Sequence, residues 1–169
     1  MRLDHELLGG RRLRTAFEIR DDLHEFAESW LQGAGVLNAA QQLRYADGAL
    51  VAVLYRQAPY QVELCCVVGG TVIPDHTHPN ADTIEVPVAG LLRLRVNGVD
   101  PFAQMSDERL QAFRRPFGIR INHDDVHGTE VGAPGSMFLS IQRWVGEPKS
   151  VLSDYEGQPL GAMHKGMIL

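Results

Sequence analysis

The sequence predicts an all-β protein, a sandwich or barrel, with one helix on its N-terminal side. From Ala49 onward, short runs rich in Val, Ile, Leu and aromatic residues are separated by turns of Gly, Pro, Asn and Asp. Many short strands at this spacing are typical of a sandwich or barrel. The chain has 169 residues, of which 44% are hydrophobic and 22% charged, so it is long enough for one core and too short for two comfortable domains.

The segment before the strands predicts an amphipathic helix over residues 19–32. Its apolar residues repeat at helical spacing, and acidic residues occupy the opposite side. Gly33 and Gly35 follow and are expected to end the helix. We expect residues 1–45 to form a helical extension that packs on the barrel as a lid or brace.

The barrel itself is expected over residues 46–145. Ser106 is a suitable N-cap for one or two helical turns over 106–113. The tail over 146–169 has no periodicity, and we expect it to run over the surface or across a neighbouring subunit. The predicted strands are 49–56, 60–68, 83–88, 91–96, 118–122 and 137–144.

Histidines gather in two short segments and indicate a metal site. His76 and His78 stand two residues apart, and residues at this spacing on a strand point to the same face. A second segment, residues 118–128, contains His123 and His127, so four of the seven histidines lie in the two segments. Neutral imidazole is a good ligand for zinc, iron, copper, nickel or manganese.

The two segments resemble the two motifs of the cupin superfamily. Its first motif reads Gly-x5-His-x-His-x3or4-Glu-x6-Gly, and Gly70, His76, His78 and Gly90 fall where that pattern requires them. Its second motif reads Pro-x-Gly-x2-His, and His127 takes the place of the final histidine. The resemblance covers about half of the chain, from about residue 60 to 145. It implies a double-stranded β-helix, or jelly-roll, barrel that holds a divalent transition metal: iron, zinc, manganese or nickel.

The carboxylate of the first motif is displaced in this chain. The family's glutamate would fall at Asp82 or Thr83, whereas the only glutamate in the segment is Glu85. Strand alternation counted back from Gly90 places Thr83, Glu85 and Pro87 on the inward face and Asp82 on the outward face. We therefore expect Glu85 to be the fourth ligand, with Asp82 as the substitute if the loop bulges.

The second motif also departs from the family pattern. Asn122 and Asp124 stand where the family has Pro and Gly, and both residue types tolerate the backbone of a tight turn. His123 lies near His127, so it is either an alternative ligand or a residue that supports one. On the last strand, Ser140, Gln142 and Trp144 share a face, which either lines a pocket or meets solvent, since the opposite face is more apolar.

The sequence leaves two classes of function open. One is a metal-dependent enzyme acting on a small organic molecule: a dioxygenase with iron, or a Lewis-acid isomerase, decarboxylase or hydrolase with zinc or manganese. The other is a non-enzymatic cupin that binds a small ligand or serves as an accessory protein. Cupins carry unrelated chemistries, and no general base or nucleophile stands out beyond the metal set.

Charge and hydropathy argue against nucleic acid and membranes as partners. A net charge of −5 gives no basic surface for nucleic acid. No apolar run approaches a membrane span, and the N-terminus lacks the apolar core of a signal peptide, so we expect a cytoplasmic protein. Cys65 and Cys66 are neighbours on a strand and are expected to be reduced.

A row of branched aliphatic residues suggests an oligomer. Ile84, Val86 and Val88 alternate with the inward Glu85, so they face away from the cavity. Such a row requires a cover, from the N-terminal segment, from a second sheet layer or from another subunit. Together with apolar residues in the C-terminal tail, it leads us to expect a homodimer.

Overall fold

A computed structural model describes residues 21–34, 42–46, 49–78, 80–100, 102–112 and 118–145. Its strands are all antiparallel and run in the order β1-β2-β3-β7-β5-β6, with β4 paired to β7 outside this path. The predicted tail over 146–169 lies outside the described residues, as do the residues before 21. The strands are β1 Gln42–Ala46, β2 Ala49–Gln57, β3 Tyr60–Val67, β4 Val72–His76, β5 Ala81–Val96, β6 Ile119–Ile121 and β7 His127–Trp144.

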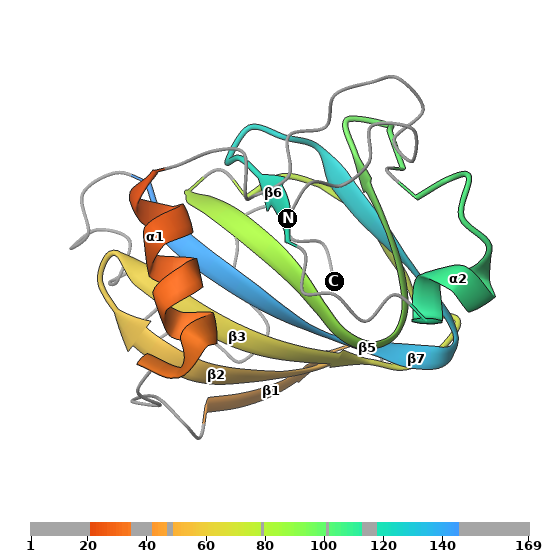
Figure 1. The fold of residues 1–169 in the computed structure, drawn as a ribbon, viewed down its shortest axis with the longest axis horizontal. Helices are drawn as coiled ribbons and strands as arrows, with labels where there is room; N and C mark the ends of the chain where they lie inside the picture. Colours follow the sequence, from red (N-terminus) through yellow and green to blue (C-terminus); the bar gives the residue numbers. More distant parts are fainter. Residues whose placement is uncertain are drawn as a thin grey trace.

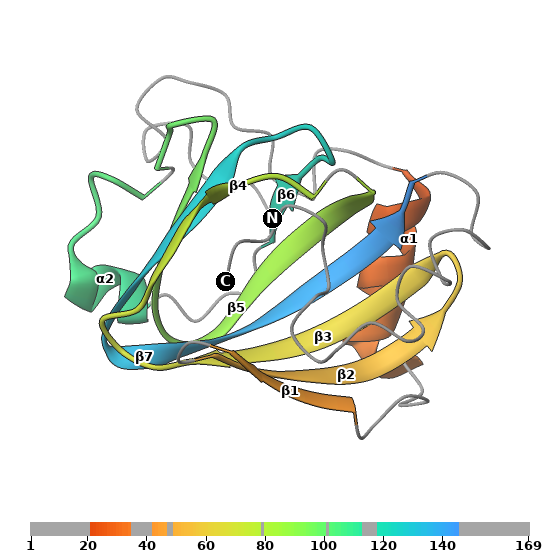
Figure 2. The same cartoon turned by 180° about the vertical axis from the view of Figure 1, so that it is seen from behind.

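Two long strands, β5 and β7, bend and take part in both layers of the barrel (Figures 1 and 2). The first part of β7 pairs with β4 and with the end of β5, whereas its second part pairs with β3 and with the start of β5. The bend requires glycine: Gly90 has a φ of 81°, and a Cβ there would lie 2.1 Å from the carbonyl oxygen of Gly135.

The strand predictions are confirmed in position and corrected in extent. The segments 83–88 and 91–96 form one strand, β5, and 137–144 is the second half of β7. The sequence did not predict β4, the first half of β7, or β1, and β1 starts the sheet at Gln42, inside the segment assigned to the extension. The Pro and Gly residues of β4 and of the first half of β7, such as Pro74 and Gly132, look like turn residues.

The predicted helix is present as α1, Asp22–Ser29, and continues as one π-helical turn, η2, over Trp30–Ala34. Asp21 caps it, because its side chain accepts a hydrogen bond from the backbone N–H of His24 at 3.0 Å. The helix lies against one face of the sheet (Figure 1) and buries Leu23 and Ala27 there. The residues on that face of the sheet are Val62, Ile84, Val86, Leu139 and Ile141.

This packing removes the main reason for expecting a dimer. Ile84 and Val86 pack in one buried cluster with Leu23 of α1 and are 2% and 4% exposed, whereas Val88 is 53% exposed. The N-terminal helix is therefore the cover that the aliphatic row needs, and the row does not by itself require a second subunit. The homodimer stays a prediction.

A second helix, α2 over Asp107–Ala112, closes another side of the barrel. The Ser106 hydroxyl accepts a hydrogen bond from the backbone N–H of Arg109 at 3.4 Å, so the predicted N-cap is confirmed. Leu110 of α2 packs into a buried cluster with residues of β5 and β6, among them Val96, Ile119 and Ile121. Within the described part of the chain, neither α-helix is long and apolar enough to cross a membrane.

Candidate metal centre

Three histidines converge between the ends of β4 and β7. His76 is the last residue of β4, His78 follows two residues later, and His127 is the first residue of β7. His76 and His127 are directly paired across the two strands, which places their side chains on the same face. One nitrogen from each ring lies within 4.8 Å of the others, and this is the only such group of three or more metal-binding side chains among the described residues.

The spacing of the ring nitrogens suits a single ion. The Nε2 atoms of His76 and His78 lie 3.0 Å apart. Imidazole nitrogens bind zinc at about 2.0–2.1 Å, so two of them separated by an octahedral or tetrahedral angle stand about 2.9–3.4 Å apart. The ring of His127 is centred 4.3 Å from that of His76 and 4.6 Å from that of His78. The three rings thus surround one point.

Backbone carbonyls fix which nitrogen of two rings is available. Nδ1 of His76 lies 2.8 Å from the carbonyl oxygen of Pro74, and Nδ1 of His127 lies 3.3 Å from that of Asp125. A carbonyl only accepts, so each Nδ1 carries the proton and donates it, which leaves the lone pair on Nε2. The rings are therefore held in the tautomer that a metal requires.

Burial keeps the His127 ring in its uncharged, ligating form. His78 is 4% exposed and His127 is 5% exposed. Burial, together with the neighbouring charge of His76, lowers the pKa of His127 to about 4. At neutral pH the His127 ring is thus already deprotonated and needs to lose no proton to bind an ion.

Glu85 lies in a different environment from the one that the motif suggested. It is inward and 6% exposed, as the alternation predicted, but it is not part of the histidine group. Its Oε1 accepts a hydrogen bond from the Ser140 hydroxyl at 2.8 Å. Burial, with a further contribution from the negative charge of Glu63, raises the pKa of Glu85 to about 8. Its role as a metal ligand stays a prediction.

Asp82 and His123, the two alternative ligands, bind each other. Asp82 Oδ1 lies 2.9 Å from His123 Nδ1 and accepts the backbone N–H of His123 at 3.0 Å. Asp82 Oδ2 also accepts from Arg143 at 2.6 Å and from Arg120 at 3.3 Å. Burial alone would raise the pKa of Asp82, but these hydrogen bonds, led by that of His123, bring it below its usual value. Neither residue belongs to the histidine group.

The face of Ser140, Gln142 and Trp144 is buried, with side chains 4%, 1% and 5% exposed. Ser140 and Gln142 belong to a polar network that also contains Glu63 of β3, which sequence analysis missed. The signal was present, because Gln61, Glu63 and Cys65 alternate on β3, but polar residues in such a pattern are usually assigned to solvent.

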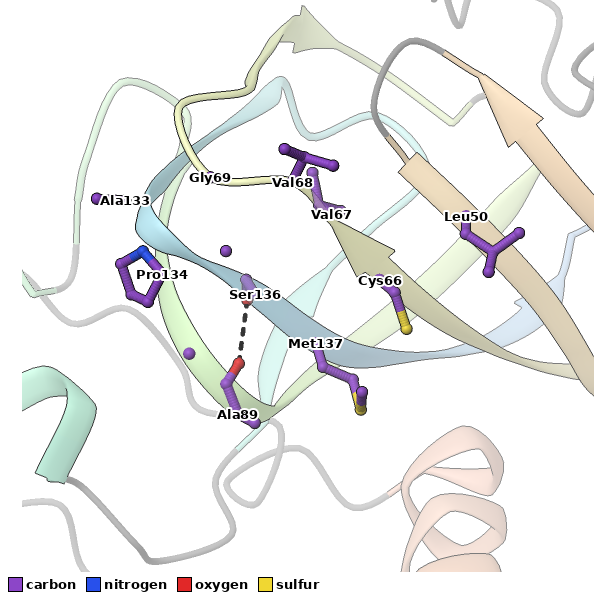
Figure 3. A pocket seen from close by; sticks show the side chains of 12 residues that line it. Leu50, Cys66, Val67, Val68, Gly69, Ala89, Ala133, Pro134, Ser136 and Met137 are labelled. Carbon is purple, nitrogen blue, oxygen red and sulfur yellow. Dashed lines mark hydrogen bonds between the residues drawn. The ribbon is translucent and has the colours of Figure 1, made fainter.

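A separate hollow on the barrel surface contains none of these residues. It is lined mainly by small and apolar residues of β2, β3, β5 and β7 and of the turn that follows β3 (Figure 3). Cys66 and Met137 face it, and the Ser136 hydroxyl donates to the carbonyl oxygen of Ala89 at its edge. It offers no converging set of polar groups.

Comparisons with known proteins find no sequence match but several similar solved structures. No family model matches the sequence, and no curated protein matches it. Similar solved structures include KdgF from Halomonas sp., with 14% identity, a TM-score of 0.49, and coverage of 63% of this chain and 89% of KdgF. A cupin-2 domain protein from Rhodospirillum rubrum has 12% identity, a TM-score of 0.48 and coverage of 73% and 86%. A protein from Klebsiella pneumoniae with a double-stranded β-helix domain has 16% identity and a TM-score of 0.46, with coverage of 62% of this chain and 91% of that protein.

Two bent strands shared between two antiparallel layers, with a histidine cluster between the ends of β4 and β7, match the architecture that the two motifs implied. The strand order and the shared strands are those of the two-layered β-barrel that the resemblance implied. The fold prediction, an all-β double-stranded β-helix with an N-terminal helix, is confirmed by this topology. Within this fold, His76, His78 and His127 form a group that could hold a metal ion.

Proposed function

We propose that this protein is a metal-dependent cupin enzyme that acts on a small organic molecule. The observation that supports the proposal most is the convergence of three buried or half-buried imidazoles, two of which, His76 and His127, are held with the lone pair on Nε2. Structural zinc sites in proteins are closed by four protein ligands, whereas catalytic sites have three and keep a position open for water or substrate. A three-histidine set is therefore the catalytic type of donor set.

The donor set fits a divalent transition ion. Three neutral imidazoles suit zinc, iron, manganese or nickel, with His76, His78 and His127 as the holding residues. A bound ion would supply Lewis acidity to a carbonyl or hydroxyl oxygen or, if it is iron, dioxygen chemistry. The chain's own contribution is to orient the rings of His76 and His127 through backbone carbonyls, to keep the His127 ring uncharged, and to bury the site between two β layers.

Elemental analysis and a substrate panel test this proposal. Protein purified without chelator should contain about one equivalent of a transition metal, and the His78→Ala variant should contain none. Oxygen uptake and product analysis with catechols, thiols and diketones then test the dioxygenase and the isomerase, decarboxylase or hydrolase branches. The matched control is His123→Ala, which removes a neighbouring histidine outside the group. Wild-type protein that binds metal but converts no member of the panel would favour the non-enzymatic, ligand-binding alternative.

We also propose a cytoplasmic location. Cys65 and Cys66, the two cysteines of the chain, form no disulfide, and the cytosol keeps thiols in this reduced state. Fractionation of cells that express the protein at its native level, followed by immunodetection, would test this location. Recovery in an oxidising compartment would contradict it.

A further inference from the structure

Six polar side chains form a continuous surface on the inside of the barrel, which we call the polar wall. Facing pairs bring them together, Gln61 with Gln142 and Glu63 with Ser140 across β3 and β7. All six are between 0% and 6% exposed. They alternate with the residues that pack on α1, so they point away from that helix. The polar wall consists of Gln61, Glu63, Thr83, Glu85, Ser140 and Gln142.

The polar wall faces the interior that the histidines also face. Glu85 is paired with Ile119 of β6, so the two side chains share a face. Ile119 packs in one buried cluster with Val96 of the opposite layer. Val96 is in turn paired with His127 and shares its face. The polar wall and the histidine group therefore line the same space between the two layers.

The hydrogen bonds of the polar wall run in one direction. Arg56 can only donate, and its Nε donates to Gln61 Oε1 at 2.6 Å. Gln61 Nε2 then donates to Gln142 Oε1 at 3.4 Å, and Gln142 Nε2 donates to Ser140 Oγ at 3.1 Å. The Ser140 hydroxyl proton is left to donate to Glu85 Oε1. The chain therefore ends on Glu85, with Oε1 as an acceptor.

This direction places any proton of Glu85 on its other oxygen. Oε1 is occupied by the Ser140 donor, so a protonated Glu85 carries its hydrogen on Oε2. Oε2 is buried and makes no hydrogen bond of good geometry, and the same holds for the hydroxyl of Thr83, two residues away on the same face, although that hydroxyl lies close enough to Glu85 to lower the pKa of its carboxyl. Buried polar atoms without partners are rare in folded proteins and often mark a place that a ligand or water fills.

We propose that Thr83 and Glu85 form a binding site for the carbonyl or hydroxyl oxygen of an uncharged small ligand, with Glu85 as a protonated donor. The inference rests on the proposed function only in that the same interior also holds the metal site. It replaces the expected role of Glu85 as a metal ligand. Thr83 is one of the two positions, with Asp82, where the motif's ligating glutamate would fall, and the Glu85 carboxylate lies two residues further along the strand.

The charges of the polar wall select against an anionic ligand. Both oxygens of Glu63 accept amide N–H groups, from Gln61 at 2.9 Å and from Gln142 at 3.1 Å, which favours its charged form. A second negative charge beside it would be repelled. Burial raises the pKa of Glu85 to about 8, so at neutral pH this side chain is an uncharged acid that can donate.

Infrared spectroscopy tests the protonation state directly. A protonated carboxylic acid has a C=O stretch that is resolved from carboxylates and amides. The wild-type protein should show this band at pH 6 and lose it as the pH rises through about 8. The Glu85→Gln variant should lack the band, and Glu25→Gln, which removes an exposed carboxylate on α1, should retain it. Absence of the band in wild-type protein, or its survival in Glu85→Gln, would overturn the proposal.

Two probes of matched size test the ligand class. Hydroxyacetone is neutral, and glycolate carries a carboxylate oxygen in place of its methyl group. Hydroxyacetone should shift the Glu85 band and bind the wild-type protein more tightly than glycolate. Thr83→Val should weaken its binding about three- to tenfold, the usual range for one neutral hydrogen bond. Equal binding of both probes, or no effect of hydroxyacetone, would contradict the proposal.

A pair of Glu85 variants separates a donor from a structural residue. Glu85→Gln keeps an N–H donor in place of the acid, so hydroxyacetone affinity should remain within about twofold of wild type at pH 7. Wild-type affinity should fall as the pH rises above about 8, whereas that of Glu85→Gln should stay constant. Glu85→Leu should lose binding at every pH.

The charged or titratable groups facing Glu85 are Glu63 on β3 and, from the opposite layer, the histidine group. The facing residues of β6 and β7, Ile119 and Ser140, do not titrate in this range.

Measuring the metal content distinguishes a failure of this inference from a failure of the proposed function. Glu85→Gln should bind as much metal as the wild type. Metal loss in this variant would make Glu85 a ligand and overturn the inference while leaving the metal site in place. A wild-type protein without metal would contradict the proposed function, and the infrared band would still test Glu85.

Discussion

Replacing Glu85 by Gln should make the protein more stable at neutral pH. The folded state raises the pKa of Glu85 from 4.5 to about 8, mainly by burial, so it binds a proton that the unfolded chain releases. Between these two values the folded state holds more protons, and stability therefore falls as the pH rises. Gln is uncharged at every pH, and its oxygen can still accept the Ser140 hydrogen bond.

The size of this effect follows from the two pKa values. Each pH unit above 4.5 costs about 1.4 kcal/mol until the folded value near 8 is reached, so the destabilisation is about 3 kcal/mol at pH 7. Urea denaturation of metal-free protein between pH 4 and pH 9 measures it. Wild type and Glu85→Gln should have similar stability near pH 4 and diverge steadily above it. Parallel pH profiles for the two proteins would refute the assignment of Glu85 as a buried acid.

Three further predictions concern the surroundings of the site. Asp82→Asn should lower stability by about 2–4 kcal/mol in urea denaturation, because it removes the carboxylate that pairs with the buried Arg120, and it should leave metal content unchanged. In the wild type this contribution should be lost as the pH falls below 3.8, because folding lowers the pKa of Asp82. The free energy of unfolding of Asp82→Asn should not show this loss at acid pH, which is the check. Leu23→Ala should cost about 3 kcal/mol on thermal or chemical unfolding, since Leu23 is fully buried between α1 and the sheet, and a loss below 1 kcal/mol would mean that α1 is not the cover of Ile84. Light scattering should give about twice 18.7 kDa for the proposed homodimer, and a monomer mass would leave α1 as the only cover that the aliphatic row has.

The sequence predicts best those elements in which alternation and burial agree. On β5, Ile84 and Val86 point to α1 while Thr83 and Glu85 point inward, as the alternation indicated. The strand β4 shows no such pattern, because most of it is exposed and its place is fixed by pairing with β7. A strand held mainly by backbone hydrogen bonds leaves little trace in side-chain periodicity.

The histidines could be found from spacing, whereas their neighbours could not. His76 and His78 are close in sequence, and His127 was recognised from a motif. Asp82 binds Arg120 and Arg143, which lie 38 and 61 residues further along the chain. Only the register of β5 with β6 and β7 brings these three side chains together. The polar wall was missed for a related reason. Gln61 and Glu63 bond within β3, but the bonds of Gln142 to Glu63 and of Ser140 to Glu85 join β7 to β3 and to β5, which no single segment reveals.

The most direct test of the metal centre compares His127→Ala with His123→Ala. Both variants remove a histidine from the same turn region, but only His127 belongs to the group that could bind an ion. Metal content of well-folded protein, measured by elemental analysis after reconstitution with one equivalent of zinc, should fall to near zero in His127→Ala and stay near one in His123→Ala. Full occupancy in His127→Ala, or loss of metal in His123→Ala alone, would contradict the assignment of the three histidines.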